Sequence, residues 1–355
     1  MSNTSNKLTA ATVTHNGETI ASLSAGQTAT LRCAGMKMIG DVVVAVDSSI
    51  GSGSAGDEAW IDDGNTHIWI SLPEGRTSPM LGVCPKGTIT VDWGDGTTST
   101  LTGTSTSTVK WTSTHNYASA GDYVITLSGS GTMSITADSY GTALLRCTST
   151  NDNRNKVYQN AIQRVEVGSN VTSLGMYAFY NCYSVKRIKI QEGMTSIGQG
   201  AFYNCYALSS LAIPNSVTTI DKNAIYTCYT LFGIVFPDSV STIGNNVLCN
   251  SYVLKNVVIP SSLTAINSDF CSNCYSLASV TIPKSVTSIA QYAFQKCYSL
   301  KKVRFESDTP PAITSTYAFK DIPTDCIISV PVGSLSAYTS ATNYPSSATY
   351  TYVEE

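Results

Sequence analysis

The sequence has little charge, little histidine and no long apolar run. Charged residues make up 13% of the 355 residues, and the formal net charge is -3, where about 25% charged residues is usual. This balance gives no electrostatic basis for binding nucleic acid. No apolar run approaches the roughly 18 residues of a membrane helix, so we expect no membrane insertion. The first residues also lack the apolar core of a secretory signal, which predicts a protein used without Sec export or separated from its leader.

Serine, threonine and glycine take the place of the missing charge. This composition favours a β-rich protein with an extracellular or virion type of surface, and the length predicts roughly two to four domains. The 11 cysteines would suggest a disulfide framework in a small secreted domain. Five of them instead recur at one fixed interval and its multiples: Cys182, Cys205, Cys228, Cys274 and Cys297. This spacing predicts small apolar side chains at a crowded turn, not disulfide pairs.

The C-terminal half repeats itself every 23 residues. The repeated segments begin at Phe179, Phe202, Ile225, Leu248, Cys271 and Phe294. Apolar residues alternate near the end of each segment, as at Leu208, Leu211 and Ile213, which predicts a short strand with one face inward. One coil cannot bury that face alone, but stacked coils can, so we predict a solenoid of parallel strands. A proline ends several strands: Pro214, Pro237, Pro260 and Pro283.

A second, smaller apolar motif lies between these segments, as in Val217 to Asp221. The residues that end it are Gly175, Gly198, Asp221, Gly244 and Asn267. We expect left-handed corners at these positions, because glycine, asparagine and aspartate tolerate that backbone. Cys271 and Cys274 have the spacing of a metal or redox pair, but both lie on the repeat, which favours a buried core role.

The repeats resemble the BspA or treponemal type of bacterial leucine-rich repeat, with a pattern close to I-G-x-x-A-F-x-x-C-x-x-L-x-x-I-x-I-P. The resemblance covers residues 171–305 and implies a mainly β fold, a leucine-rich-repeat solenoid. Ser251 replaces the cysteine, and Ile225, Leu248 and Cys271 replace the phenylalanine, which a core tolerates. Residues 306–355 are predicted to form the C-terminal cap, with a last strand and a short helix N-capped by Ser334.

The N-terminal half has a different pattern. Residues 48–63 begin as a Gly/Ser run and predict a flexible linker. Alternation at Thr88–Trp93 and Tyr123–Leu127 predicts strands, and Gly94-Asp95-Gly96 predicts a tight turn. Together with His115-Asn116-Tyr117 these motifs are similar to PKD domains. The resemblance implies an immunoglobulin-like β-sandwich over residues 64–138, followed by a connector and N-terminal cap over residues 139–170.

Residues 1–47 are predicted to form a small β module with strands at Glu18–Leu23 and Asp41–Val46. These residues look like a leader module found at the start of phage and prophage tail-associated proteins of gut Firmicutes.

Catalytic chemistry has little support in the sequence. The histidines His15, His67 and His115 have no evident partner, and His115 is expected to pack in the sandwich. Asp92 and Asp95 suggest either calcium or a turn held by carboxylates that cap local N–H groups. No phosphate-binding loop, dinucleotide motif or zinc motif occurs. We therefore expect no enzyme and no cofactor or metal.

Two features of the repeats are candidates for ligand binding. A tyrosine precedes each strand, and the column is expected to stack into an aromatic ladder that either presents a glycan platform or shields the coil edge. Its members are Tyr183, Tyr206, Tyr229, Tyr252, Tyr275 and Tyr298. The outward side of the strands carries Phe232, Val235 and Val258 beside Lys255 and Asn256, and the end coils add bases: Lys186, Arg187, Lys189, Lys301, Lys302 and Arg304. An apolar centre rimmed by bases is typical of a binding surface.

The sequence alone favours a phage or prophage tail-associated protein, on the virion, that binds a host-surface protein or glycan through its repeats. The alternative is an adhesin of the BspA type on a bacterial cell surface. An enzyme is the third class, and it would need a site that the sequence does not reveal. A homo-oligomer is compatible with the first two.

Overall fold

The computed structural model describes residues 11–15, 18–23, 60–136, 144–146 and 152–355, which belong to two compact units, residues 1–60 and 61–355. In the first unit, β1 (Ala11–His15) and β2 (Glu18–Leu23) form an antiparallel hairpin. This confirms the strand expected at Glu18–Leu23. The strand expected at Asp41–Val46 and the linker up to residue 59 lie outside the described residues. The likeness of residues 1–47 to a tail-protein module stays a prediction.

The second unit begins with an antiparallel β module. Its strands are β3 (Thr66–Leu72), β4 (Met80–Asp92), β5 (Thr98–Thr104), β6 (Lys110–Trp111), β7 (Gly121–Ser128), β8 (Thr132–Ile135) and β9 (Leu145–Arg146). The long strand β4 pairs with β5, β6, β7, β8 and β9. The strands expected at Thr88–Trp93 and Tyr123–Leu127 are confirmed within β4 and β7, apart from Trp93, which follows β4. The assignment of this module to a PKD sandwich stays a prediction.

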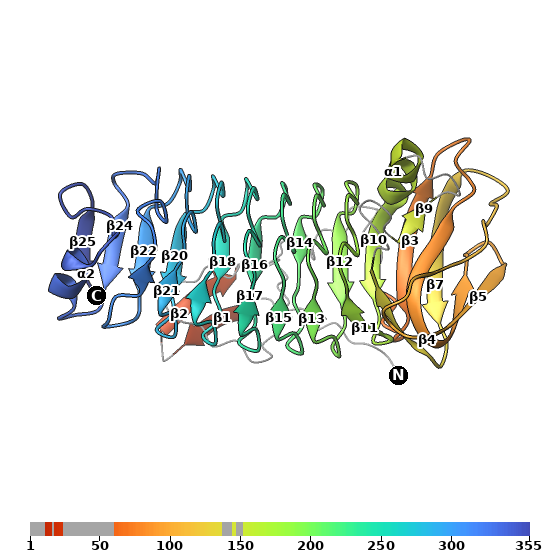
Figure 1. Ribbon diagram of the computed structural model, residues 1–355, viewed down its shortest axis with the longest axis horizontal. Helices are drawn as coiled ribbons and strands as arrows, with labels where there is room; N and C mark the ends of the chain where they lie inside the picture. Colours follow the sequence, from red (N-terminus) through yellow and green to blue (C-terminus); the bar gives the residue numbers. More distant parts are fainter. Residues whose placement is uncertain (1–10, 16–17, 24–59, 137–143, 147–151) are drawn as a thin grey trace. The chain divides into compact units, whose positions relative to one another are not determined.

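The same module covers the first coil of the repeats. After α1 (Asp152–Ala161), β10 (Ile162–Val167) pairs antiparallel with β3, and β11 (Val171–Leu174) pairs parallel with β8. The strand pairing therefore runs from the module into the repeats (Figure 1). The sequence places the N-terminal cap within residues 139–170, whereas β3 and β8 supply the strands that cover the open edges of the first coil.

The repeats form two series of parallel strands, one on each side of the coils (Figure 1). The first series is β12 (Arg187–Ile190), β14 (Ser210–Leu211), β16 (Gly233–Val235), β18 (Asn256–Val258), β20 (Ser279–Ile282), β22 (Lys302–Phe305) and β24 (Ile327–Val330). The second series is β13 (Ser196–Ile197), β15 (Thr219–Ile220), β17 (Thr242–Ile243), β19 (Ala265–Ile266), β21 (Ser288–Ile289) and β23 (Ala312–Ile313). Arg187 pairs with Ser210 and Ile197 with Leu174, which confirms a coil of 23 residues.

The inward side chains of each coil form the core. Leu208, Leu211 and Ile213 are buried, as the alternation predicts. The repeat cysteines are buried free thiols. Most of them donate from Sγ to a main-chain carbonyl oxygen of the preceding coil at 3.3–3.4 Å: Cys205 to Phe179, Cys228 to Phe202, Cys274 to Leu248 and Cys297 to Cys271. The cysteine column thus fills space and satisfies buried carbonyls.

In one coil, two neighbouring core positions carry their large and small side chains in the reverse order. Elsewhere a small residue precedes a larger one, as in Ala201–Phe202 and Ala293–Phe294, but Phe270–Cys271 reverses the order and both side chains are buried. The Phe270 ring centroid lies 6.1 Å from that of Phe294. The coil thus keeps one aromatic and one small side chain in its core, and Phe270 compensates for the smaller Cys271 at the phenylalanine position.

The prediction of left-handed corners at Gly175, Gly198, Asp221, Gly244 and Asn267 is wrong. Positive φ angles occur in two later columns: Tyr177, Gly200, Asn223, Asn246, Asp269 and Tyr292, and then Asn181, Asn204, Thr227, Asn250, Asn273 and Lys296. Gly198 and Gly244 are instead places of close approach, where a Cβ would lie 2.7 Å from the Gly175 carbonyl carbon and 2.3 Å from the Lys222 nitrogen. Amides link the second column, as Asn204 Nδ2 donates to Asn181 Oδ1 at 2.8 Å.

The C-terminal end has the expected last strand, β24, and helix, α2 (Leu335–Ser340). Ser334 is the N-cap residue of α2, as predicted, but its side chain makes no capping hydrogen bond. Glu354 Oε1 accepts the N–H groups of Gly333 at 2.9 Å and Leu335 at 3.1 Å instead. Glu354 belongs to β25 (Thr351–Glu354), a parallel strand beside β24 that the sequence did not predict. Neither α1 nor α2, the helices of the described residues, is long and apolar enough to cross a membrane.

Candidate binding site

The outward positions of the first strand series form what we call the strand face, and its middle carries the predicted apolar residues. Phe232 and Val235 are 43% and 41% exposed, and Val258 is half-buried. The pairing of β16 with β18 sets Val235 beside Val258 and Gly233 beside Asn256. Lys255 is exposed, and its Nζ lies 5.0 Å from the centroid of the Phe232 ring. The structure therefore brings all five predicted strand-face residues together on two adjacent coils.

Three of the six predicted bases at the ends of the strand face make ion pairs: Lys189, Lys301 and Lys302. Lys189 contacts the carboxylates of Asp62 and buried Glu166. Lys301 Nζ lies 2.6 Å from Asp325, and Lys302 Nζ lies 2.7 Å from Glu355. The hydrogen bonds from these lysines hold the pKa of Asp325 and of Glu355 below their ordinary values. The predicted basic rim is therefore partly neutralised by carboxylates that lie outside the repeat pattern, and the centre of the face is the distinctive part.

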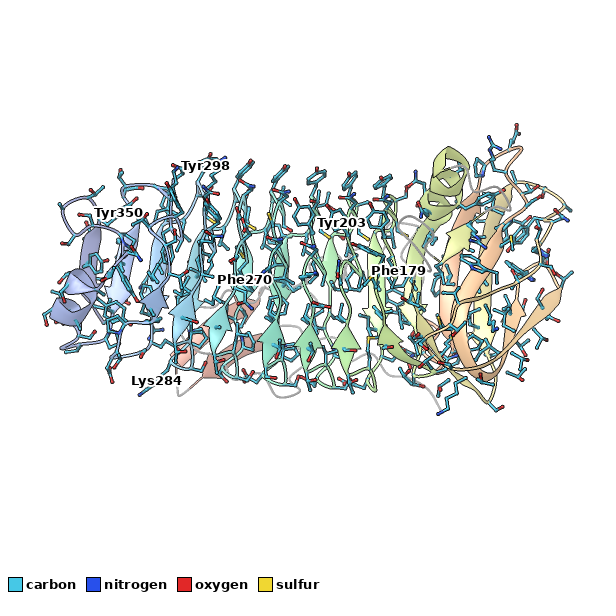
Figure 2. All side chains as sticks on the ribbon, viewed as in Figure 1. Phe179, Tyr203, Phe270, Lys284, Tyr298 and Tyr350 are labelled. Atoms are coloured by element: carbon cyan, nitrogen blue, oxygen red, sulfur yellow. The ribbon has the colours of Figure 1, made fainter. Side chains whose placement is uncertain are left out.

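The tyrosine column stacks as the sequence predicts. Successive rings from Tyr183 to Tyr298 have centroids 4.6–5.2 Å apart and interplanar angles of at most 28°. Tyr298 projects from the edge of the solenoid opposite Lys284 (Figure 2). A second, shorter ladder that the sequence analysis missed contains Tyr180, Tyr203 and Tyr226, with centroids 5.4 and 4.6 Å apart. The same 23-residue step aligns these tyrosines and could have revealed them.

Stacking decides what the ladder offers to a ligand. A sugar stacks on an open aromatic face, but inside the ladder each face of Tyr206, Tyr229, Tyr252 and Tyr275 is covered by the neighbouring ring. Only the ring edges and the hydroxyl groups of these tyrosines remain for a ligand to contact. Burial, followed by the neighbouring tyrosines, raises the pKa of Tyr206 and Tyr252. This geometry favours a role in shielding the coil edge over a glycan platform.

Two histidines have partners that the sequence did not suggest. His67 is buried, with Nε2 at 2.8 Å from Asp63 Oδ1 and Nδ1 at 3.0 Å from Thr126 Oγ1. Burial acts to raise the pKa of Asp63, but hydrogen bonds from His67 and Asn65 outweigh it and lower that pKa to about 2. His67 and Thr126 are opposite each other on β3 and β7. The three groups therefore tie the loop before β3 to the sheet.

His115 packs in the β module, as predicted. Its ring stacks on Trp93 with centroids 4.4 Å apart, and its Nε2 lies 2.8 Å from Asp95 Oδ2. Asp92 accepts the Gly94 N–H at 2.9 Å and Asp95 accepts the Thr97 N–H at 3.1 Å. These contacts favour local capping over calcium.

The cysteine pair of the repeats has the environment of a core. Cys271 and Cys274 are fully buried, and burial raises the pKa of Cys271 well above its ordinary value, which opposes thiolate formation. Within the described part of the chain, no group of three or more histidine, cysteine or acidic side chains is arranged to hold a metal ion.

Stacked parallel strands, a regular coil and inward leucines and isoleucines define the class of protein as a leucine-rich-repeat solenoid. The family described as the BspA type leucine rich repeat region matches six copies, at residues 153–278 and 264–340. These ranges cover more than half of the chain, and the chain belongs to this family.

Several solved structures are similar to the chain. A leucine-rich repeat protein from Bacteroides ovatus is 23% identical, with a TM-score of 0.40, over 48% of this chain and 50% of that one. A leucine rich cell surface protein from Faecalibacterium prausnitzii is 21% identical, with a TM-score of 0.30, over 56% of this chain and 62% of that one. A leucine rich repeat protein from T. pallidum is 22% identical, with a TM-score of 0.35, over 47% of this chain and 82% of that one. No curated protein matches the chain.

Proposed function

We propose that the protein is a non-enzymatic adhesin that acts at a bacterial cell surface and binds its ligand through the strand face. The observation that carries this proposal is the exposed pair Phe232 and Val235, which lies with Lys255 on rigid, adjacent coils. An exposed apolar group beside a polar rim is the usual form of a protein recognition surface. Membership of the BspA type family supports a binding role over catalysis.

The adhesin proposal replaces the tail-associated protein that the sequence alone favours. The tail proposal rests on the leader-like residues 1–47, on the missing apolar signal and on the unpaired cysteines. Most of residues 1–47 lie outside the described residues, and no comparison supports the tail association. The likeness of residues 64–138 to a PKD domain fits either function. In the adhesin, that module's pairing with β10 and β11 would hold the solenoid on a stable base.

The test compares two alanine variants of the full chain, one at a phenylalanine of the strand face and one at a tyrosine of the ladder. Purified wild type, Phe232→Ala and Tyr229→Ala proteins are added to cultured epithelial cells, and bound protein is measured over a concentration series. A dominant aromatic contact contributes a few kcal/mol, so we expect Phe232→Ala to weaken binding about tenfold or more. Tyr229→Ala should bind like the wild type. Unchanged binding by Phe232→Ala, with thermal unfolding of both variants close to wild type, would exclude the strand face as the recognition surface.

A further inference from the structure

The strand face carries no acidic side chain in its repeated columns. Its three outward columns, which start at Lys186, Arg187 and Lys189, contain no aspartate or glutamate through the six coils up to Arg304. The whole chain nevertheless has more acidic than basic residues, 24 against 21. The columns of the face therefore carry bases and no acidic side chain on a protein of negative net charge. This distribution attracts an anionic partner at the centre of the face, where no carboxylate of the described residues pairs with the base.

Lys255 is the base that the central coils present. Three of the end lysines, Lys189, Lys301 and Lys302, have carboxylate partners, whereas Lys255 has no ion pair among the described residues. Its contact is with the Phe232 ring, 5.0 Å from the ammonium group. A ligand carboxylate placed here would meet a cation and an apolar surface together.

Gly233 leaves a gap between the exposed side chains. Apart from its chain neighbours, a Cβ on Gly233 would meet Asn256, at 3.5 Å from its carbonyl oxygen and 3.8 Å from its Cβ, which is ordinary contact. Gly233 also does not have a positive φ. The fold therefore does not require glycine at this position, and glycine weakens a strand. Its effect is on the surface, where it opens room between Phe232 and Val235, which are 43% and 41% exposed.

We infer that the strand face binds a protein segment in which a carboxylate stands beside an aliphatic or aromatic side chain. The carboxylate pairs with Lys255, and the apolar side chain enters the space above Gly233, between Phe232 and Val235. This inference rests on the proposed function, because it assumes that the strand face is the recognition surface. A glycan fits less well, since Lys255 lies over the Phe232 ring and the ladder tyrosines cover one another.

The experiment selects a displayed library of random short peptides on the immobilised full chain. We expect the enriched peptides to carry aspartate or glutamate next to leucine, isoleucine, valine or phenylalanine. Gly233→Val, which fills the gap with a good strand former, and Lys255→Glu should each weaken a selected peptide about tenfold or more. A peptide with lysine in place of its acidic residue should regain binding to Lys255→Glu. Ser279→Val, in the same column two coils away, is the matched control and should bind normally.

The outcomes separate this inference from the proposed function. Selected peptides that lack an acidic residue, or that bind Gly233→Val and Lys255→Glu as they bind the wild type, would overturn the inference. If these peptides also bind Phe232→Ala as they bind the wild type, the proposed function of the strand face as the recognition surface is wrong as well. If polygalacturonate binds the wild type but not Lys255→Glu, and no peptide is enriched, the face binds an anionic glycan and only the ligand chemistry is wrong. If neither probe binds, the inference is overturned.

Discussion

Ser251 stands in the cysteine column and lacks the hydrogen bond to the preceding coil that Cys205, Cys228, Cys274 and Cys297 make. Its side chain is fully buried, and its Oγ has no hydrogen-bond partner among the described residues. The column thiols of Cys228 and Cys274 reach a carbonyl oxygen at 3.4 and 3.3 Å, because a C–S bond is longer than a C–O bond. A buried polar group without a partner costs about 1–3 kcal/mol, and a typical hydrogen bond contributes about 1 kcal/mol.

Ser251→Cys should therefore raise the free energy of unfolding by about 1–2 kcal/mol, since the weak thiol donor recovers only part of a typical hydrogen bond. In a unit of this size the melting temperature should rise by about 2–6 °C. The assay is thermal and urea unfolding under reducing conditions, so that no new disulfide forms. Ser251→Ala should be close to neutral, and Cys228→Ser should cost about 1–2 kcal/mol. A Ser251→Cys protein no more stable than wild type would show that the missing hydrogen bond at position 251 does not destabilise the solenoid.

Four further predictions concern the core and its titrating groups. Leu208→Ala should cost about 2–5 kcal/mol in urea unfolding, and a loss below about 1 kcal/mol would contradict its burial. Mass mapping of the native protein should find Cys182, Cys205, Cys228, Cys274 and Cys297 reduced, and a disulfide among them would contradict the thiol–carbonyl contacts. Burial raises the pKa of Cys182 and Cys228 from 9.0 to about 12. Between these two pKa values the folded thiols keep protons that the unfolded thiols lose. The free energy of unfolding should therefore fall as the pH rises through this range, and it should fall less steeply in Cys182→Ala than in the wild type. The pKa of Asp63 is lowered from 3.8 to about 2, so its contribution to stability should disappear as pH falls between those values, and Asp63→Asn should remove that pH dependence.

The regular part of the fold was predictable because each coil repeats the same local physics. Alternating apolar residues such as Leu211 and Ile213 set the inward face of the strands, and the fixed interval set the stacking of the tyrosines. The left-handed corners were misplaced because glycine has two uses. Gly198 permits close approach of backbones, while asparagines such as Asn204 adopt the positive φ.

The rest depends on contacts between distant parts of the chain. Nothing local in β3 or β8 indicates that they pair with β10 and β11. The partners of the end lysines, among them Asp62 and Glu355, lie outside the repeated segments, so the period cannot reveal them. In the candidate site, Phe232, Val235 and Lys255 were predictable from their outward register. The gap at Gly233 was not, because only the packing around it shows that the fold does not need a glycine there.

Site-directed photo-crosslinking can show whether the ligand touches the strand face. A photoreactive phenylalanine derivative replaces, in separate full-length proteins, Val235 on the strand face, Thr230 beside the tyrosine ladder or Thr242 in the second strand series; all three side chains are exposed. The proteins are bound to epithelial cells and irradiated, and covalent adducts are counted. We expect adducts at position 235 and few at positions 230 and 242. Adducts concentrated at 230 or 242, with position 235 silent, would contradict it.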